Sequence, residues 1–393
     1  SAKISSNSKC SERVRFNESF ICLWRVVHVR LRTGVLMKQN WNFLGFFLLS
    51  IIFLHSCGSS DTNQNDVDSE VPVVATGGDL DPNSSGKGYF EVPSGTVSFL
   101  IHATSPSSIR PQFTSLKDPD GNEIMTNLGE FAWRSSGYSN VLVPISSNYS
   151  AKQGVWSYSV SNYSQLSIGK RTIAISSVPT IKVQPYITGT TYTSDNISSA
   201  LTIMKNIYST NGVILDVLET ITLSESKYSQ VSYDFTNSVT SEMASKGLAD
   251  RVNLFFISDY TDASYLGNSA GIPGSQGLAG SHNGVLISLK AHKNGDGSLK
   301  DQLLGETAGH EMGHFLGLFH PSESNGILFD PITDTPQCPS SKNTNNDSNL
   351  TAEECGQEYG ADNLMFWDAW DNGNQDNLTA GQFYVLNRAL IAK

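Results

Sequence analysis

The chain has 393 residues, 38% of them hydrophobic and 16% charged, and a formal net charge of -11 at pH 7. That length accommodates two domains with separate hydrophobic cores. The composition is typical of a soluble globular protein. The acidic balance argues against a nucleic acid partner, because a phosphate backbone requires clustered lysine and arginine.

Residues 1–57 differ from the rest of the chain and are expected to be a leader followed by a signal peptide. A signal begins naturally at Met37, and residues 43–54 form an apolar run that is too short for a comfortable membrane span but typical of a signal-peptide core. The run ends in Leu54-His55-Ser56-Cys57, which resembles the lipobox of bacterial lipoproteins, where the cysteine becomes the lipidated N-terminus. The resemblance implies lipidation of Cys57, export, and a bacterial cell envelope or surface lipoprotein, in the outer membrane or released. The alternative is an ordinary signal peptide with an incidental cysteine.

Two segments follow before the pattern changes at residue 179. Residues 58–87 are polar and rich in Gly, Ser and Asn, so we expect a flexible tether. Residues 88–178 hold short stretches of alternating polar and apolar residues between turn signals, which predicts a small all-β sandwich domain. It loosely resembles the jelly-roll-like accessory domains of secreted bacterial peptidases through Gly154, Trp156, Tyr158, Val160 and Asn162. No cluster of catalytic residue types lies there, so a binding or spacing role is expected.

Residues 179–393 alternate between strand and helix patterns, which predicts an α/β domain. Strands are predicted over residues 180–188, 213–223, 251–258 and 285–289. Helices are predicted from Ser194 or Asp195 to Gly212, over residues 228–247 and over residues 301–319.

The last of these helices carries a histidine cluster, HEMGHFLGLFH at residues 310–320, with three of the eight histidines in the chain. His310 and His314 are four residues apart, so on a helix their rings project from one face and can bind one zinc ion at about 2.0–2.1 Å. Glu311 lies one position round the helix, where it can hold a water in the fourth ligand position and accept its proton.

His320 cannot join the other two histidines along a straight helix, because ten residues would carry it about 15 Å away. Gly317 resolves this, since glycine takes the positive-φ conformation that ends a helix and lets the chain turn back. The pattern therefore predicts His310, His314 and His320 as ligands of one catalytic zinc with an open position. A buried helix with coincidental histidines is the alternative. A structural zinc site is disfavoured, because such sites are usually closed by four protein ligands.

HExxHxxGxxH is the zinc signature of the metzincin metallopeptidases, and the chain resembles that family. The resemblance implies a metzincin-like α+β or α/β catalytic domain over residues 179–393, with a twisted mixed sheet and an active-site helix above the cleft. It also implies a Met-turn beneath the zinc, for which Met365 in the stretch 362–367 is the candidate. An ordinary core methionine is the alternative for Met365.

The C-terminal third looks most like the pappalysins among the metzincins. The residues that carry this resemblance are Asp334, Thr335, Pro336, Cys338, Cys355, Asn363, Met365 and the stretch 378–382. Two positions depart from the pattern. Pro321 follows the third histidine, as in the serralysin group, and Trp367 stands where several groups have a tyrosine. The phenol of Tyr359 is a candidate substitute.

Further expectations concern the surroundings of the helix. Cys338 and Cys355 are an isolated pair in an expected exported protein, so we predict a disulfide, with two free thiols as the alternative.

In metzincins an edge strand pairs with the extended substrate, and residues 280–289 are the candidate here, with His282 at the rim of the cleft. Acidic residues after the helix could hold a structural calcium ion, as in pappalysin relatives, or form a solvated surface: Asp330, Asp334, Asp347, Glu353, Glu354, Glu358 and Asp362.

The function predicted from these features is that of a lipid-anchored zinc endopeptidase, acting as a monomer on protein or peptide substrates. Zinc lowers the pKa of its water toward about 7, and Glu311 takes the proton and delivers it to the leaving amine. Only the N-terminal lipid would contact the membrane. The alternative is a surface lipoprotein that binds a host or envelope protein through an inactive or narrowly active peptidase scaffold. The intact histidines and Glu311 favour the enzyme.

Overall fold

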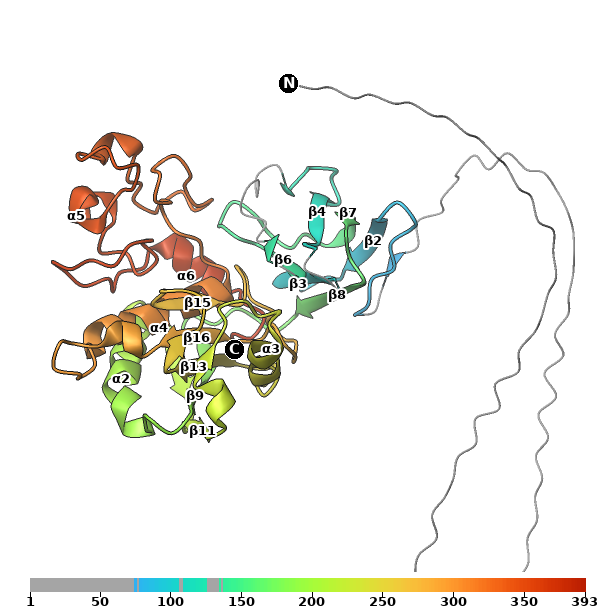
Figure 1. Cartoon of the computed structure of the whole chain (residues 1–393). Coiled ribbons are helices and arrows are strands. Elements are labelled where there is room, and N and C mark those ends of the chain that lie inside the picture. Colours follow the sequence, from blue (N-terminus) through green and yellow to red (C-terminus); the bar gives the residue numbers. More distant parts are fainter. Residues whose placement is uncertain (1–73, 76–77, 106–108, 126–133, 136) are drawn as a thin grey trace, which may run out of the picture. The chain divides into compact units, whose positions relative to one another are not determined.

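A six-stranded sheet lies at the centre of residues 179–393 (Figure 1). The computed structural model describes residues 74–75, 78–105, 109–125, 134–135 and 137–393. The strands run in the order β10-β9-β13-β16-β15, with β11 also paired to β9. Every pairing in the sheet is parallel except that of β15 with β16, so the sheet is mixed. The strands are β9 (Thr180–Thr188), β10 (Ile214–Val217), β11 (Ile221–Leu223), β13 (Val252–Ile257), β15 (Gly267–Ser269) and β16 (Val285–Ser288); β12 (Gln230–Val231) and β14 (Asp259–Tyr260) pair separately.

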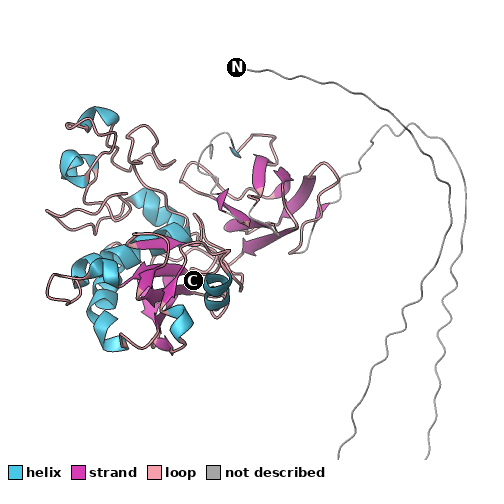
Figure 2. Ribbon diagram, in the orientation of Figure 1, coloured by secondary structure: helices cyan, strands magenta, loops and turns pink. Residues whose placement is uncertain are grey.

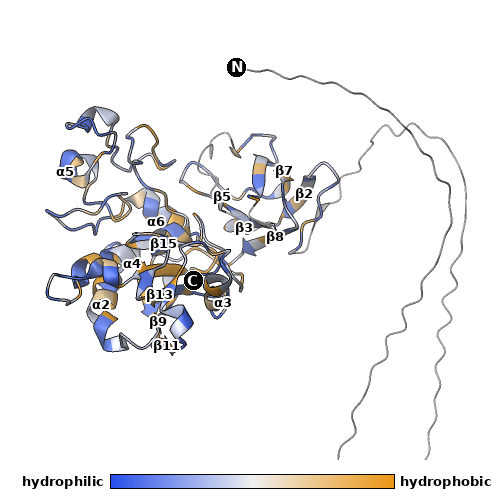
Figure 3. Ribbon diagram, in the orientation of Figure 1, coloured by the Kyte–Doolittle hydropathy of each residue, from blue (hydrophilic) through white to orange (hydrophobic). Residues whose placement is uncertain are grey.

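Helices cover both faces of this sheet, which explains why β13 is buried at every position and, apart from Asn253, apolar (Figure 3 shows the hydropathy). Leu254 and Phe256 pack in one hydrophobic cluster with α2 and α4, while Phe255 and Ile257 pack in a second cluster with α3. Successive strand side chains point to opposite faces, so the two clusters lie on the two sides of the sheet. The helices are α2 (Ser194–Thr210), α3 (Ser238–Ala244), α4 (Asp301–Leu316), α5 (Ala352–Cys355) and α6 (Ala380–Leu386), drawn in cyan in Figure 2.

Two four-stranded sheets precede residue 179 and pack face to face, as a sandwich requires. Their strand orders are β1-β2-β7-β4 and β5-β6-β3-β8, antiparallel apart from the β1–β2 pair. Phe90 and Trp156 from the first sheet enclose Phe99 from the second, with ring centroids 5.2 and 4.9 Å from Phe99. The strands are β1 (Val74–Ala75), β2 (Lys87–Val92), β3 (Ser98–Thr104), β4 (Gln112–Lys117), β5 (Arg134–Ser135), β6 (Tyr138–Val143), β7 (Gly154–Ser161) and β8 (Gln165–Arg171).

The sandwich and the C-terminal part are joined by buried hydrogen bonds. Arg171, at the end of β8, is only 3% exposed and donates to the carbonyls of Asn387 and Ala389 at 2.6 and 3.0 Å. Asn140 on β6 donates to the carbonyl of Pro273 at 2.9 Å. The described residues belong to one compact unit, so the domain division between residues 178 and 179 stays a prediction.

The strand predicted over residues 213–223 is wrong as a single element, because it breaks into β10 and β11. The break lies opposite Gln184 and Pro185 of β9, between the pairs Val217–Val183 and Ile221–Tyr186. Proline has no amide hydrogen to donate to a ladder. The side chain of Gln184 instead donates to the carbonyl of Glu219 at 2.6 Å.

The helix predicted over residues 228–247 is also wrong in extent, since only Ser238–Ala244 is α-helical. The side chain of Asp234 accepts from the amide of Thr236 at 2.8 Å, and that of Asn237 accepts from Val239 at 3.0 Å. Short polar side chains that capture nearby amides compete with helix formation, and here Asn237 becomes the N-cap.

The predicted tether extends too far, because its described C-terminal end packs on the sandwich. β1 pairs with β2, and the buried Leu80 donates its amide to the carbonyl of Leu166 at 2.9 Å. The predicted leader, signal peptide and lipidated Cys57 lie outside the described residues. Within the described ranges, none of the helices combines the length and the apolar character needed to cross a membrane.

Candidate metal centre

Helix α4 carries His310 and His314 on one face, and its end brings His320 back to them. The helix stops at Gly317, whose φ of 110° is the left-handed conformation predicted from the sequence. The chain reverses there, and the Nε2 atoms of His314 and His320 lie 3.0 Å apart. The structure therefore brings together all three histidines that the motif singled out.

Each of these imidazoles has its Nδ1 atom engaged elsewhere. His310 Nδ1 lies 2.8 Å from the carbonyl of Leu364, and His314 Nδ1 lies 2.7 Å from that of Leu318. His320 Nδ1 lies 3.1 Å from both carboxylate oxygens of Glu323. Carbonyl and carboxylate oxygens can only accept, so Nδ1 carries the hydrogen and the Nε2 lone pair is left free for a ligand.

The donor set fits a zinc ion. One nitrogen from each of the three rings lies within 4.8 Å of the others. Three nitrogens at about 2.0–2.1 Å from a tetrahedral zinc would be about 3.3 Å apart, so small ring movements suffice. Burial lowers the pKa of His310 to about 3 and holds that of His314 well below its ordinary value, with the neighbouring histidines acting in the same direction. Metal ligation requires these neutral imidazoles.

Glu311 is buried beside the histidines, against the edge strand of the sheet. Its carboxylate accepts a backbone hydrogen bond from Ser269 on β15, and burial raises its pKa to about 8. A Cβ atom at Gly267 would lie only 2.7 Å from Glu311 Cγ, so glycine makes room for this carboxylate. The raised pKa is the kind that a group exchanging protons near neutral pH requires.

Met365 lies beneath the helix turn between the two helical histidines. A Cβ atom at Gly313 would overlap its Sδ atom, so glycine at this position lets the methionine pack closely against the helix. The preceding residue, Leu364, supplies the carbonyl that holds His310. Met365 therefore packs against the helix that carries the histidines, and its role as a Met-turn stays a prediction.

The edge strand predicted over residues 280–289 is wrong. That segment contains β16, which lies between β13 and β15, whereas β15 is the edge strand and runs antiparallel to β16. His282 is not at the rim of the cleft with the three histidines either. It lines a different cavity with His102, and its ring centroid lies 3.9 Å from that of Tyr138, with the two ring planes tilted by 40°.

A cavity of about 190 Å³ adjoins His310 and Glu311. Trp367 lines it, at the position where a tyrosine was expected from the family. Tyr359 does not line this cavity and packs instead near the disulfide, with Lys342 over its ring at 3.9 Å. The remaining lining residues are Tyr265, Leu266, Gly267, Leu303, Glu306, Thr307, Leu364, Phe366, Ala369 and Gln375.

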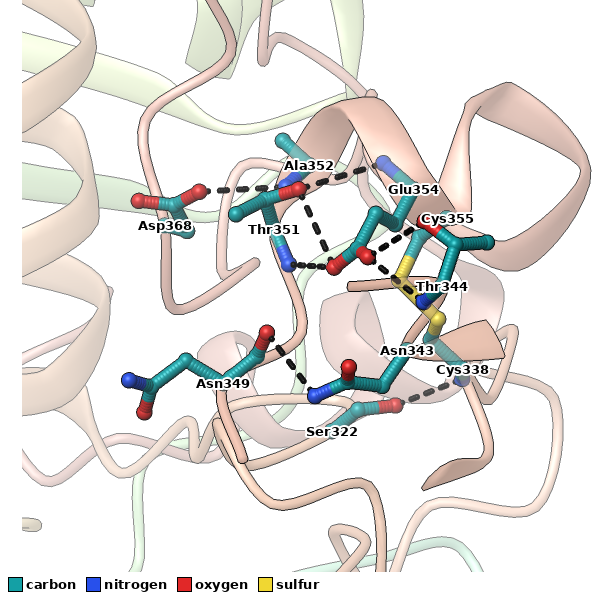
Figure 4. Close-up of a disulfide and its surroundings, with 10 residues drawn as sticks. All are labelled: Ser322, Cys338, Asn343, Thr344, Asn349, Thr351, Ala352, Glu354, Cys355 and Asp368. Atoms are coloured by element: carbon teal, nitrogen blue, oxygen red, sulfur yellow. Dashed lines mark hydrogen bonds between the residues drawn. A yellow bond between two sulfur atoms is a disulfide. The ribbon is translucent and has the colours of Figure 1, made fainter. Parts of the chain in front are cut away.

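The predicted disulfide between Cys338 and Cys355 is present (Figure 4). Beside it, Glu354 accepts hydrogen bonds from Thr344 and Thr351 and so closes the N-terminal cap of α5 (Figure 4). Separate partners also donate hydrogen bonds to Asp330, Asp334, Asp347, Glu353 and Asp362; Asp334, for example, accepts from the amide of Gly381 at the start of α6. Across the described ranges, the three histidines are the one group of His, Cys, Asp and Glu close enough to share an ion, so the structure does not support the calcium prediction.

Two carboxylates near the site were missed in the sequence. Glu323 holds the third histidine from three residues further on, and Glu306 lines the cavity one helical turn before His310. The spacing of Glu306 and His310 at positions i and i+4 could have revealed that they share a face. The bond from Glu323 depends on a loop conformation that no periodicity predicts.

No family model matches the chain, and no curated protein matches it. Among solved structures it is similar to an archaemetzincin from Methanopyrus kandleri, with 16% identity, a TM-score of 0.25, and coverage of 37% of this chain and 78% of that one. It is also similar to metalloproteinase-II from Bacteroides fragilis, with 15% identity, a TM-score of 0.26, and coverage of 40% of this chain and 50% of that one. Neither similarity assigns the chain to a family, so the metzincin and pappalysin placements both stay predictions.

Proposed function

We propose that this protein is a zinc-dependent endopeptidase of the metzincin type that hydrolyses peptide bonds in protein substrates. The observation that carries the proposal is the convergence of three imidazoles, each with Nδ1 already bonded, beside one buried carboxylate. Three histidines leave a fourth ligand position open, which distinguishes a catalytic from a structural zinc site.

A zinc ion held by these histidines would supply a Lewis acid and a water acidic enough to lose a proton near pH 7. Glu311 is the group that moves that proton. Its buried carboxylate accepts the proton at an oxygen and then passes it to the nitrogen of the leaving amine. The raised pKa of Glu311 makes its carboxylate a stronger base for the water proton than an exposed glutamate would be.

The edge strand β15 supports a peptide substrate. It is paired on one side by β16, and within the described part of the chain no strand pairs with its other side. An extended peptide can add there as a further strand and lie along the cleft. Ser269, on this strand, also donates to Glu311, so the strand that would align the substrate also positions the catalytic carboxylate.

The proposal includes the location of the enzyme. Export and lipidation at Cys57 rest on the lipobox-like sequence, with the membrane touched only by the N-terminal lipid. A monomer acting on protein or peptide substrates remains the expected form.

The test compares residues 58–393 with the same protein carrying Glu311→Ala. Zinc is measured by elemental mass spectrometry, and cleavage is measured on a denatured protein mixture. We expect about one zinc per chain in both proteins and cleavage only with Glu311 present. Loss of the general base should lower the rate about 10²- to 10⁴-fold. A folded protein that binds no zinc would refute the proposal, and zinc without cleavage would favour the binding-protein alternative.

A further inference from the structure

A second cavity, of about 700 Å³, shares no lining residue with the cavity beside the metal centre. On its sandwich side, the pairing of β3 with β8 sets His102 opposite Ser167 and Thr104 opposite Gln165. These four side chains share one face of the sheet, because opposed residues point the same way. The loop that joins β15 to β16 supplies residues 278–283. The volume lies in the range of sites that bind small molecules, ~300–1,000 Å³.

The lining of this cavity is polar but nearly uncharged. Among the described residues that form it there is no lysine or arginine, and the single carboxylate, Asp79, is exposed. Burial lowers the pKa of His102 and lowers that of His282 to about 4, so both rings are neutral at pH 7. The rest of the lining combines hydroxyl and amide groups with apolar side chains: Thr104, Ser105, Gln165, Ser167, Ser275, Ser281 and Asn283, with Leu80, Leu166, Leu278 and Ala279.

His102 presents a hydrogen-bond acceptor whose orientation is fixed by the fold. Asn140 donates through Nδ2 to the carbonyl of Pro273 at 2.9 Å, so its Oδ1 is the atom that meets His102 Nδ1. An amide oxygen can only accept, so Nδ1 carries the hydrogen and Nε2 keeps its lone pair. Within the described ranges, no residue forms a hydrogen bond with this Nε2.

Two further lining residues have buried polar atoms without a partner among the described residues. Asn283 donates through Nδ2 to the carbonyl of Leu248 at 3.0 Å, which leaves Oδ1 as an acceptor with no donor. His282 has its Nδ1 3.2 Å from the hydroxyl of Ser281, but its Nε2 is unpaired. A buried polar group without a hydrogen bond destabilises the folded state. A ligand in the cavity can supply the missing partners.

These features define the chemistry of the ligand. Carboxylate and phosphate groups bring acceptors only, so they cannot satisfy His102 Nε2 or Asn283 Oδ1. An ammonium group brings donors, but burying its charge against uncharged walls is costly. Hydroxyl groups donate to these two acceptors and also accept from the serine and threonine hydroxyls. The leucines can contact the C–H faces of a sugar ring.

We propose that this cavity binds a short uncharged carbohydrate. Its hydroxyls would donate to His102 Nε2 and Asn283 Oδ1, and the face shared by Ser167 and Gln165 would hold the remaining hydroxyls. The site uses none of the metal ligands, so the inference goes beyond the proposed peptidase function and does not depend on it.

The test applies the Glu311→Ala protein, which is expected not to cleave, to an array of uncharged, sialylated, sulfated and amine-bearing sugars. The uncharged sugar with the strongest signal is then titrated by isothermal calorimetry, with spermine titrated separately as a cationic probe. We expect saturable binding of the uncharged sugar and weaker binding of the charged probes. Absence of binding to every uncharged sugar, or a preference for a charged sugar or spermine, overturns the inference.

Two variants locate the binding. His102→Leu removes the oriented acceptor and should weaken binding about 3- to 10-fold, as loss of one hydrogen bond implies. Ser167→Leu fills part of the cavity without removing a side-chain hydrogen bond that the structure shows, and it should weaken binding at least as much. Ser157→Leu is the matched control, because it makes the same change at a half-buried serine of β7 in the other sheet.

Thermal unfolding establishes that each variant is folded, and Ser167→Leu decides the result if His102→Leu is not. Binding that is weakened by Ser167→Leu and retained by Ser157→Leu supports the inference. Binding that Ser167→Leu leaves unchanged, or that Ser157→Leu weakens equally, overturns it. Zinc content and cleavage play no part in these measurements, so a failed peptidase proposal leaves their outcome intact.

Discussion

Replacing Gly313 by alanine should damage the metal centre from beneath, whereas the same change at Gly309, one turn away, should not. A Cβ at position 313 would overlap Met365 Sδ and lie 3.2 Å from its Cε. At position 309 the nearest atom, Leu364 Cδ1, would be 3.4 Å away, an ordinary contact. Met365 is fully buried, so it cannot swing aside without repacking its neighbours.

The expected loss of unfolding free energy is obtained by comparing Gly313→Ala with Gly309→Ala. Both gain about 1 kcal/mol in helix propensity, because alanine replaces glycine inside α4. Gly313→Ala alone also carries the cost of overpacking, about 1–3 kcal/mol. The difference in free energy of unfolding between the two variants should therefore equal that cost. Zinc affinity should fall in Gly313→Ala as well, since displacing Met365 moves the carbonyl of Leu364 that holds His310.

Urea unfolding of the metal-free proteins gives the free energies, and titration with zinc gives the affinities. The double variant Gly313→Ala/Met365→Ala supplies the control. Removing the methionine side chain removes the overlap, so the alanine at position 313 should be tolerated better in that background. Equal stability of Gly313→Ala and Gly309→Ala, or a penalty that persists without the methionine side chain, would refute the reasoning.

Three further perturbations each disrupt a different contact around the site: acidification, removal of the Glu323 carboxylate and reduction of the disulfide. Acidification from pH 7 to pH 4 should cost about 3 kcal/mol of unfolding free energy through His292, because burial lowers its pKa from 6.5 to about 4. Urea unfolding of the metal-free protein at several pH values measures this loss. Glu323→Ala should weaken zinc binding about 10- to 100-fold, since the carboxylate orients His320; competition with a zinc-sensitive dye measures the affinity. Reduction of the Cys338–Cys355 bond, whose cysteines are 17 residues apart, should cost about 3 kcal/mol, seen as a lower thermal midpoint.

The direction of the stability change with pH depends on whether folded or unfolded His292 binds a proton at the higher pH. Its ring is 0% exposed, with Nδ1 2.6 Å from the carbonyl of Ser288 and Nε2 2.9 Å from the hydroxyl of Thr307. Between pH 6.5 and about 4 the unfolded chain takes up a proton that the folded state does not, so stability is full above 6.5 and falls with acid. His292→Gln should flatten this part of the pH profile, and an unchanged profile would contradict the assignment.

The predictions for Glu323 and for the disulfide each have a control. Glu219→Ala removes a carboxylate remote from the metal centre. If this variant lost as much zinc affinity as Glu323→Ala, Glu323 would act only through net charge. The reduced protein should keep its zinc, because the histidines are held by Leu364, Leu318 and Glu323 rather than by the disulfide. Zinc loss on reduction would show that the disulfide supports the ligands directly.

The metal centre was predictable from sequence where local geometry determines it. Four-residue spacing on a helix brings His310 and His314 together, and a glycine at position 317 allows the reversal that returns His320. The edge strand was not predictable in the same way. Gly267–Ser269 has three small or polar residues with no alternation, and it is a strand only because Leu286 and its neighbours pair with it.

The sheet itself was predictable in outline, with errors where a side chain redirects the backbone. A nearly continuous apolar run marked β13 as a central strand, as found. Two errors depend on side-chain hydrogen bonds. The bond from Gln184 lies at the break in the strand opposite Pro185, and the bond to Asp234 precedes the short helix after Asn237. Such hydrogen bonds can be predicted only when the distant partner residue, or the conformation of the local turn, is known.

The three engaged Nδ1 atoms have a consequence for the order of assembly. Their partners are two backbone carbonyls and a carboxylate, so the rings are oriented by the folded chain itself. In small zinc domains the ion and the fold form together, and a chelator unfolds them. Here the protein can fold first and acquire its ion afterwards. A chelator should therefore remove the ion and leave a folded, reloadable protein.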